Sequence, residues 1–293
     1  MKFENYHPVI NFIYFLFILL AVVTFNHPVY AMIAFITAFA YSIKLNGRRA
    51  VIFNLILIPC VFLYGLWYSF YNHFGITNIG KNFIGNNMTL ESLCYGIVRG
   101  MMAAAFIMVF SGMLTVMSTD KVIYLVGRIF PKVSLFISIF LRSFSRVRDR
   151  CKKTNISRMG IGMGMRQGNI FHAIRNFFRI VSIVITWTLE DYIESAASMK
   201  CRGYTLKGRT AFSIYRFDNR DRSVVIMFSV GIIITLMAYA LGQTNIMYDP
   251  EIIIYKPTIW AYFFYTIYAV LCLLPMMLEL FNEAVYNRLS RCQ

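Results

Sequence analysis

Two short segments place an arginine close to a glycine, and both could make charged contacts with a protein partner. They are Ser157-Arg158-Met159-Gly160 and Cys201-Arg202-Gly203. A guanidinium group stays charged at physiological pH and presents a rigid fork of donors that pairs well with carboxylates. Arg202 also falls in the last turn of a predicted helix, where a cation stabilises the helix dipole. The spacing alone leaves both roles of Arg202 open.

No segment has the residues of a catalytic or nucleotide-binding site. Residues 75–82 nearly match the phosphate-binding pattern G-x-x-x-x-G-K-[ST], but Asn82 replaces the hydroxyl that binds magnesium. The four histidines lack metal-ligand spacing, and the six cysteines form no C-x-x-C pair. We therefore expect no catalytic residue, no metal and no cofactor, and we expect the chain not to be an enzyme.

An amphipathic helix is predicted over residues 132–153, just before the first arginine segment. One face carries a basic stripe of Arg142, Arg146, Arg150 and Lys153. Another face carries the apolar residues Val133, Phe136, Phe140, Phe144, Val147 and Cys151. Such a helix can anchor to anionic lipid without any other factor, and it can equally bind a protein partner.

A second long helix is predicted over residues 169–200, after a glycine-rich loop. It begins with basic residues, Arg175 and Arg179, and carries its acidic residues later. Since the helix dipole favours the reverse order, we expect these charges to serve something other than the stability of this helix. Gly203 is predicted to end the helix in a left-handed conformation.

Charge-free runs predict six membrane-spanning helices. Residues 5–43 form a run of about twice the roughly 20 residues that cross a bilayer, and Asn26-His27-Pro28 divides it into two helices. The other runs are residues 50–80, 100–119, 223–248 and 257–278. The expected fold is an all-α polytopic membrane protein with long amphipathic cytoplasmic helices. Its expected parts are residues 1–117 with helices 1–4, residues 118–222 with the amphipathic helices, and residues 223–293 with helices 5–6.

The distribution of basic residues predicts the orientation. Of the 29 Lys and Arg residues, 20 lie in residues 118–222. The same side carries Lys44, Arg48, Arg49, Arg288 and Arg291, whereas the opposite loops hold only Lys81 and Lys256. By the positive-inside rule, we expect a multi-pass protein of the plasma membrane with both termini in the cytoplasm.

The chain resembles the transmembrane T component of energy-coupling factor transporters, a group of vitamin and metal-ion importers in the ABC superfamily. The resemblance rests on His7-Pro8, Phe130-Pro131-Lys132, Leu141-Arg142, Trp187-x-Leu189-Glu190 and Ser198-Met199-Lys200-Cys201-Arg202-Gly203-Tyr204. It implies two cytoplasmic coupling helices crossed as an X, each ending in an Ala-Arg-Gly-like motif that docks on an ATPase subunit. The implied partners are two ABC ATPase subunits, a substrate-binding membrane subunit and membrane lipid, without nucleic acid.

The resemblance leaves two accounts of the first motif open. In the first account, Arg158 stands for the docking arginine, displaced by one residue. Alternatively, Gly160 anchors the register, so that Met159 occupies the position of the arginine. In that case the surrounding cations would carry the contact as a diffuse field, and these are Arg150, Lys152, Lys153 and Arg166.

Two other functional classes remain, a stand-alone secondary carrier or channel and a membrane enzyme. Ion-coupled carriers place ionisable residues at mid-membrane depth. Here such residues are nearly absent from the predicted spans, and Arg99 and Glu279 lie near span ends. The sequence therefore favours a coupling subunit over a carrier.

Overall fold

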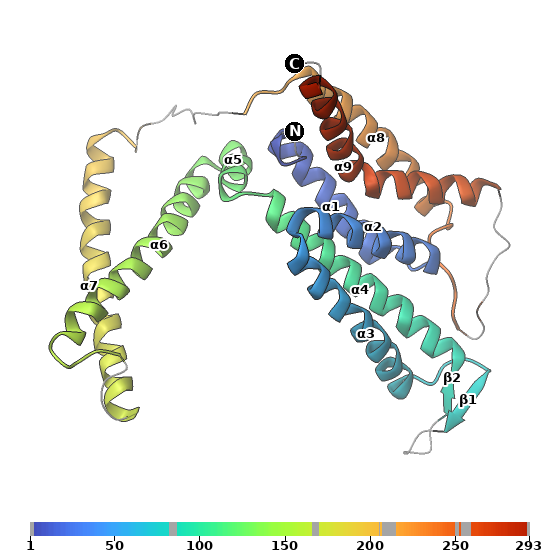
Figure 1. Ribbon diagram of the computed structural model, residues 1–293, viewed down its shortest axis with the longest axis horizontal. Helices are drawn as coiled ribbons and strands as arrows, with labels where there is room; N and C mark the ends of the chain where they lie inside the picture. Colours follow the sequence, from blue (N-terminus) through green and yellow to red (C-terminus); the bar gives the residue numbers. More distant parts are fainter. Residues whose placement is uncertain are drawn as a thin grey trace. The chain divides into compact units, whose positions relative to one another are not determined.

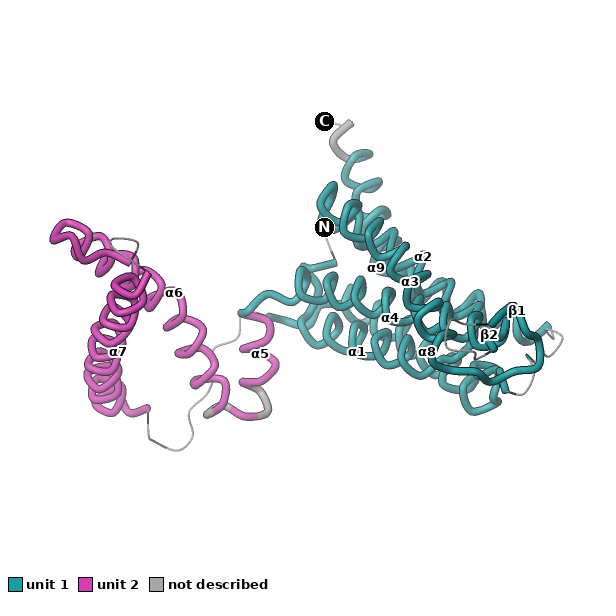
Figure 2. Tube along the Cα trace, turned by 90° about the horizontal axis from the view of Figure 1, so that it is seen from below, with its two compact units in different colours: residues 1–119, 215–293 teal, residues 120–214 magenta. Residues whose placement is uncertain are grey.

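The computed structural model describes residues 3–81, 87–165, 170–204, 206, 215–249, 252 and 259–291. Arg166, Lys256 and Asn82, which entered the sequence analysis, lie outside these residues. The chain divides into two compact units, shown in different colours in Figure 2. Unit 1 comprises Met1–Thr119 and Tyr215–Gln293, and unit 2 comprises Asp120–Ile214.

The described residues are almost entirely helical, as expected (Figure 1). Unit 1 contains the short 3-10 helix η1 (Phe3–Asn5), α1 (Pro8–Thr24), α2 (Pro28–Asn46), α3 (Arg48–Tyr71), the antiparallel strands β1 (Asn78–Lys81) and β2 (Asn87–Thr89), α4 (Leu90–Val116), α8 (Asn219–Ala240) and α9 (Ile259–Arg291). Unit 2 contains α5 (Thr119–Ile129), α6 (Pro131–Met159) and α7 (Ile170–Cys201).

The first two helices of unit 1 begin in the same way. His7 and His27 are the N-cap residues, and each is followed by a proline in the first turn. The Nδ1 atom of His27 accepts a hydrogen bond of 3.2 Å from the Val29 N–H, and His7 makes the equivalent bond of 3.3 Å to Val9. Proline suits this position because the N–H that it lacks would have no partner inside the helix. The two histidine–proline pairs therefore fix where α1 and α2 start.

An aromatic cluster holds the helices of unit 1 together. Tyr30 of α2 and Tyr268 of α9 are almost completely buried, and their ring centroids are 5.1 Å apart. Phe25, which follows α1, lies edge-on to Tyr30 with a centroid separation of 5.3 Å. In α1, the Tyr14 hydroxyl donates a 2.9 Å hydrogen bond to the Cys272 carbonyl of α9. These contacts join α1 and α2 to the last helix of the chain.

Helices α3 and α4 approach each other through small residues. A Cβ atom on Gly96 would lie 3.0 Å from the Gly65 backbone, and one on Gly100 would lie 3.0 Å from the Val61 carbonyl oxygen. The buried hydroxyls of Ser69 and Ser92 form a hydrogen bond of 2.9 Å between the two helices. Such small-residue contacts with one polar bond are typical of helix association in membranes, where apolar burial alone provides little attraction.

Several helix ends differ from the predicted runs. The run of residues 50–80 continues past the helix, because α3 ends at Tyr71 and β1 follows it. Conversely, α4 begins at Leu90 and not near residue 100, since it accommodates Glu91 and Arg99. The Thr77 hydroxyl donates to the Glu91 Oε1 atom at 2.6 Å, while Oε2 has no hydrogen-bond partner among the described residues. The helix therefore contains a carboxylate, and a charge-free run underestimates it. The last helix extends to Arg291, beyond the predicted end at 278.

Six helices of the described residues are long and apolar enough to cross a membrane, so the chain is a multi-pass membrane protein. They are α2, α3, α4, α7, α8 and the part Ile259–Arg288 of α9. The number agrees with the prediction, but the set differs. α1 has 17 residues, or about 26 Å at 1.5 Å per residue, near the lower limit for a span. α7, predicted to lie outside the bilayer, has the length and composition of a span.

Unit 2 is built around two long helices that pack against each other and run in opposite directions (Figure 1). The amphipathic helix predicted for residues 132–153 is α6, which continues to Met159. The helix predicted for residues 169–200 is α7, with ends shifted by one residue. Because α7 has 32 residues, its two ends are about 45 Å apart. Because the two helices run in opposite directions, their carboxyl ends lie at opposite ends of this helix pair.

Candidate functional site

The six residues that the sequence singles out all lie at the carboxyl ends of α6 and α7. Cys201 is the last residue of α7, and Arg202 and Gly203 form the turn after it. Arg158 and Met159 are the last residues of α6, and Gly160 follows them. The structure thus places the two motifs on separate helix ends of one unit.

The end of α7 is closed by backbone hydrogen bonds. The Tyr204 N–H donates to the Met199 carbonyl at 3.2 Å, and the Gly203 N–H donates to the Lys200 carbonyl at 3.0 Å. Gly203 has φ of 76°, the left-handed conformation predicted for it, and glycine adopts this without a steric penalty. The turn positions Arg202 on the surface, and its guanidinium makes no ion pair or hydrogen bond within the described part of the chain. Its side chain is therefore free to bind a partner.

The end of α6 has the same hydrogen-bond pattern. The Met163 N–H donates to the Arg158 carbonyl at 2.9 Å, and the Gly162 N–H donates to the Met159 carbonyl at 3.1 Å. Gly162 has φ of 77°, whereas Gly160 has φ of −63° and continues the right-handed turn. The glycine that ends the first motif is therefore Gly162 and not Gly160.

The turn geometry offers a third register for the first motif, in addition to the two that the resemblance leaves open. When the turns are matched through their left-handed glycines, Gly162 corresponds to Gly203, and Ile161 takes the position of Arg202. One of the two sequence-based accounts gave that position to Met159, with Gly160 as the anchor, and the other gave the docking role to Arg158. Arg158 corresponds to Met199, one helical turn before the position of Arg202. The two ends have one backbone geometry but present different side chains.

The end of α6 presents an apolar surface. The exposed fraction is 77% for Ile161, 48% for Met159 and 46% for Met163. The Arg158 Nε atom donates to the Met163 carbonyl oxygen at 3.4 Å, so this side chain folds back onto its own turn. The first motif therefore offers a hydrophobic tip with a partly engaged arginine, while the second offers an unpaired arginine.

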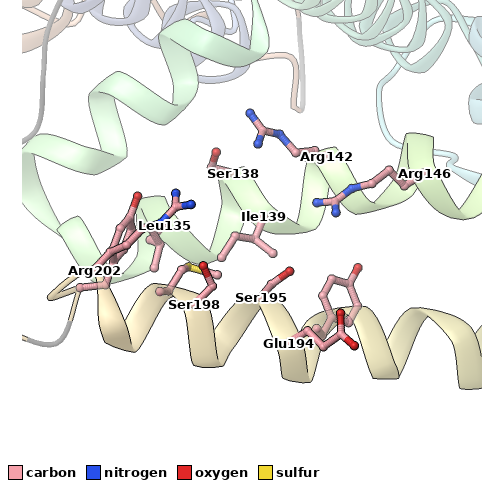
Figure 3. Close-up of a pocket in the computed structure, with 12 residues that line it drawn as sticks. Leu135, Ser138, Ile139, Arg142, Arg146, Glu194, Ser195, Ser198 and Arg202 are labelled. Carbon is pink, nitrogen blue, oxygen red and sulfur yellow. The ribbon is translucent and has the colours of Figure 1, made fainter.

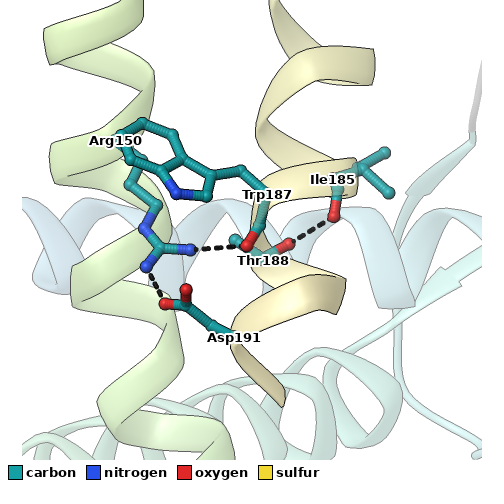
Figure 4. A network of polar contacts seen from close by, with 5 residues as sticks. All are labelled: Arg150, Ile185, Trp187, Thr188 and Asp191. Atoms are coloured by element: carbon teal, nitrogen blue, oxygen red, sulfur yellow. Dashed lines mark hydrogen bonds and ion pairs between the residues drawn. The ribbon is translucent and has the colours of Figure 1, made fainter. Parts of the chain in front are cut away.

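Arg150 joins α6 to α7 (Figure 4). Its guanidinium forms an ion pair with Asp191, donates to the Trp187 carbonyl at 3.1 Å and lies 4.9 Å from the centroid of the Trp187 ring. The side chains of Arg150 and Asp191 are 17% and 32% exposed. Arg150 is thus part of the contact between the two helices and is not a free member of a diffuse basic field. The pairing also explains one of the late acidic residues of α7, Asp191.

A groove of about 660 Å³ lies between α6 and α7 (Figure 3). Arg142 and Arg146 line it from α6, and Ser195 and Ser198 line it from α7. Arg202 lines it from the turn after α7, so the groove and the second motif share this residue. The groove was not expected from the sequence, although the spacing of Arg142 and Arg146 had already placed them on one face of the helix.

The other sequence candidates do not form sites. Residues 78–81 of the near phosphate-binding pattern lie in strand β1, which pairs with β2, and among the described residues β1 is followed by this strand and not by a helix N-terminus that could hold a phosphate. Among the described residues, no three His, Cys, Asp or Glu side chains come together as a metal site requires. The cysteines that the structure describes are unpaired.

Comparison with known proteins adds no family assignment. No protein-family model matches the chain, and no curated protein sequence matches it. The structure therefore shows an all-α, multi-pass membrane protein with a separate unit of long crossing helices.

Proposed function

We propose that this chain is the transmembrane coupling subunit of an energy-coupling factor ABC importer. In this role it transmits the ATP-driven motion of two ATPase subunits to a separate substrate-binding membrane protein, for uptake of a vitamin or another micronutrient. Unit 1 is the membrane part, and α6 and α7 are the coupling helices. The chain itself carries no catalytic residue in this proposal, and ATP hydrolysis takes place in the partners.

The proposal rests on the side chains that α6 and α7 present at opposite ends of unit 2, in turns of the same hydrogen-bond pattern. The turn itself is not distinctive, because α8 ends in the same pattern at Gly242. Two similar ends suit a scaffold that contacts two related subunits. Arg202 is the specific charged contact in this scheme, because it is exposed beside Gly203 and has no ion pair or hydrogen bond with any residue that the structure describes. The apolar tip around Ile161 makes the second contact, assisted by the exposed cations Lys152 and Lys153.

The proposed topology places unit 2 and both termini in the cytoplasm of a plasma-membrane protein. It requires α1 to cross the membrane and α7 to remain outside it. The basic residues of unit 2 and of the loop after α2 support this orientation. If both α1 and α7 crossed, there would be seven spans, and the two termini would lie on opposite sides.

Replacement of Arg202 by Ala tests the docking role. The tagged chain is purified in mild detergent from cells that contain its partners, and the retained ATPase is measured. The loss of a charge-assisted interfacial contact should weaken association by about 2 kcal/mol or more, which is roughly 30-fold. Arg202→Lys should restore it only in part, because an ammonium group lacks the fork geometry. Arg179→Ala, on the same helix, is the charge-matched control.

The same assay separates the two accounts of the first motif. Since Ile161 stands at the position of Arg202, Arg158→Ala should leave ATPase retention nearly unchanged, whereas Ile161→Asp should reduce it. Wild-type retention by Arg202→Ala would leave only the helix-dipole role for this residue and would contradict the docking scheme. Equal and salt-insensitive losses for Arg158→Ala and Arg202→Ala would show that both arginines dock specifically.

A stand-alone secondary carrier or channel is the alternative. Two buried carboxylates in unit 1 support it, because ion-coupled carriers use ionisable residues within the membrane. Glu279 accepts a 3.0 Å hydrogen bond from the Phe3 N–H, and Glu91 accepts from the Thr77 hydroxyl. One oxygen of each carboxylate is thus held by a partner in unit 1, which favours a structural role, although the buried Glu91 Oε2 atom has no partner among the described residues. Uptake by the purified chain alone in liposomes would establish the carrier, and its absence together with ATPase co-purification supports the coupling subunit.

A further inference from the structure

The groove between α6 and α7 concentrates positive charge that the described residues neutralise only in part. Arg142, Arg146 and Arg202 line it, and none of them forms an ion pair within the described residues. Glu194 is the one carboxylate among the lining residues of this groove. The lining therefore carries a net charge of +2 (three arginines minus one glutamate). Uncompensated guanidinium groups in a concave site favour an anionic ligand.

The groove lies on the polar side of the helix pair. Successive residues of an α-helix are separated by about 100°, so Phe140 and Phe144 each lie about 200° around α6 from Arg142. These phenylalanines are 61% and 71% exposed, and they form a separate apolar face. Because a bilayer or a membrane partner would cover the apolar face, the groove opens on the side that faces water. This argues for a ligand from the aqueous phase over a lipid headgroup.

The groove is elongated, which suits a segment of chain better than a single small anion. Its lining on α6 extends from Leu135 to Arg146, about 16 Å along the helix axis. Arg202 lines it together with Leu135, whereas Glu194 comes from the part of α7 that passes Arg146 and Arg150. Charges distributed along such a length match several carboxylates spaced along a peptide. The hydroxyls of Ser195 and Ser198 supply further hydrogen-bond donors.

We infer that the groove between α6 and α7 receives an acidic segment of the ATPase partner, held by Arg142 and Arg146 in addition to Arg202. This inference rests on the proposed function for the identity of the partner. The groove is then a third contact site for the ATPase on this chain, in addition to the ends of α6 and α7. Arg202 then contributes to the groove as well as to the end of α7, and Glu194 opposes the incoming carboxylates.

The test measures groove binding without the ATPase, so that its failure is distinct from a failure of the proposed function. A fluorescein-labelled hexaglutamate peptide is titrated against the purified full chain in detergent, and fluorescence anisotropy gives Kd. The double variant Arg142→Ala with Arg146→Ala should raise Kd at least 10-fold. The matched control removes two exposed arginines of α7 outside the groove, Arg175→Ala with Arg179→Ala, and should change Kd less than 2-fold.

Glu194→Gln provides a change of opposite sign. It removes the repulsive carboxylate, so it should lower Kd for the peptide and increase ATPase retention in the co-purification assay. If the groove variant and the Arg175/Arg179 control raised Kd equally, the peptide would be bound by general electrostatic attraction and not by the groove. That result would overturn the inference. Displacement of the peptide by millimolar inorganic phosphate, or by dioctanoyl-phosphatidylglycerol at the peptide's own concentration, would assign the groove to a phosphate group and would overturn it as well.

Discussion

Replacement of Gly96 by Ala should destabilise unit 1, because the backbones of α3 and α4 approach closely at this residue. The new Cβ atom would lie 3.0 Å from the Gly65 Cα atom, the Gly65 carbonyl oxygen and the Tyr68 Cβ atom. Ordinary contacts of a Cβ atom begin at 3.4 Å, so each distance is short by 0.4 Å. Two of the three atoms belong to the backbone of α3, and the helices must therefore separate. Overpacking of this kind costs about 1–3 kcal/mol.

Gly112→Ala on the same helix is the matched control. Its Cβ atom would meet its nearest neighbour, the Leu45 Cδ1 atom, at 3.5 Å, which is ordinary contact. Both substitutions gain the same helix propensity, about 1 kcal/mol per residue, so this gain cancels in the comparison. The free energy of unfolding of Gly96→Ala should be lower than that of Gly112→Ala by about 1–3 kcal/mol.

The free energy is measured by titrating the purified variants from mild detergent into SDS and following helicity by circular dichroism. Equal unfolding midpoints for the two variants would refute the close packing of α3 against α4. A lower midpoint for Gly112→Ala than for Gly96→Ala would refute it too, since the order of the two sites would then be reversed.

Three further measurements address other parts of the molecule. A double-mutant cycle of Arg150→Ala and Asp191→Ala, followed by thermal unfolding of unit 2, should give a coupling energy of about 1–3 kcal/mol, and additivity would show that the ion pair does not form. Burial lowers the pKa of His27 from 6.5 to about 4, so the unfolded state takes up a proton as pH falls from 6.5 to 4 while the folded state does not. Stability should be fully present above pH 6.5 and should decline across this window, and His27→Gln should flatten the decline; an unchanged pH profile would contradict the assignment. A single cysteine at the exposed residue Phe171, in a background without the native cysteines, should be labelled only from the cytoplasmic side, and labelling from outside intact cells would refute the topology.

Local signals in the sequence predict the long helices of unit 2 well. Proline at residue 131 and Gly203 after Arg202 predict the start of α6 and the end of α7 to within one residue, whereas α6 continues to Met159, six residues beyond its predicted end. Such residues act through their own backbone, so their effect is visible without tertiary structure. The start of α4 was predicted too late because Glu91 finds a hydroxyl partner at Thr77, which only the folded chain brings near.

The candidate site required tertiary information in two places. The first motif contains glycines at 160 and 162, and only the hydrogen bonds of the turn show that Gly162 ends it. The pairing of Arg150 with Asp191 joins residues on different helices, so no local pattern could indicate it. The sequence correctly placed Arg142, Arg146 and Arg150 on one helix. It could not show that Arg150 contacts α7 while Arg142 and Arg146 line the groove, because this depends on how α7 packs against α6.

During biosynthesis, α7 leaves the ribosome before α8 and α9 have been made. The apolar middle of this helix, residues 180–189, is flanked by Arg179 on one side and by Glu190 and Asp191 on the other. On the scale of the membrane-insertion machinery, a charged residue near the centre of a helix costs about 2.5–3.5 kcal/mol, so these flanking charges oppose lateral release of α7 into the lipid. In the proposed topology, a nascent chain that lost them would gain a span, and α8 and α9 would then be threaded in the inverted direction. A few charges on a helix outside the bilayer would in this way set the direction of the two helices that follow it.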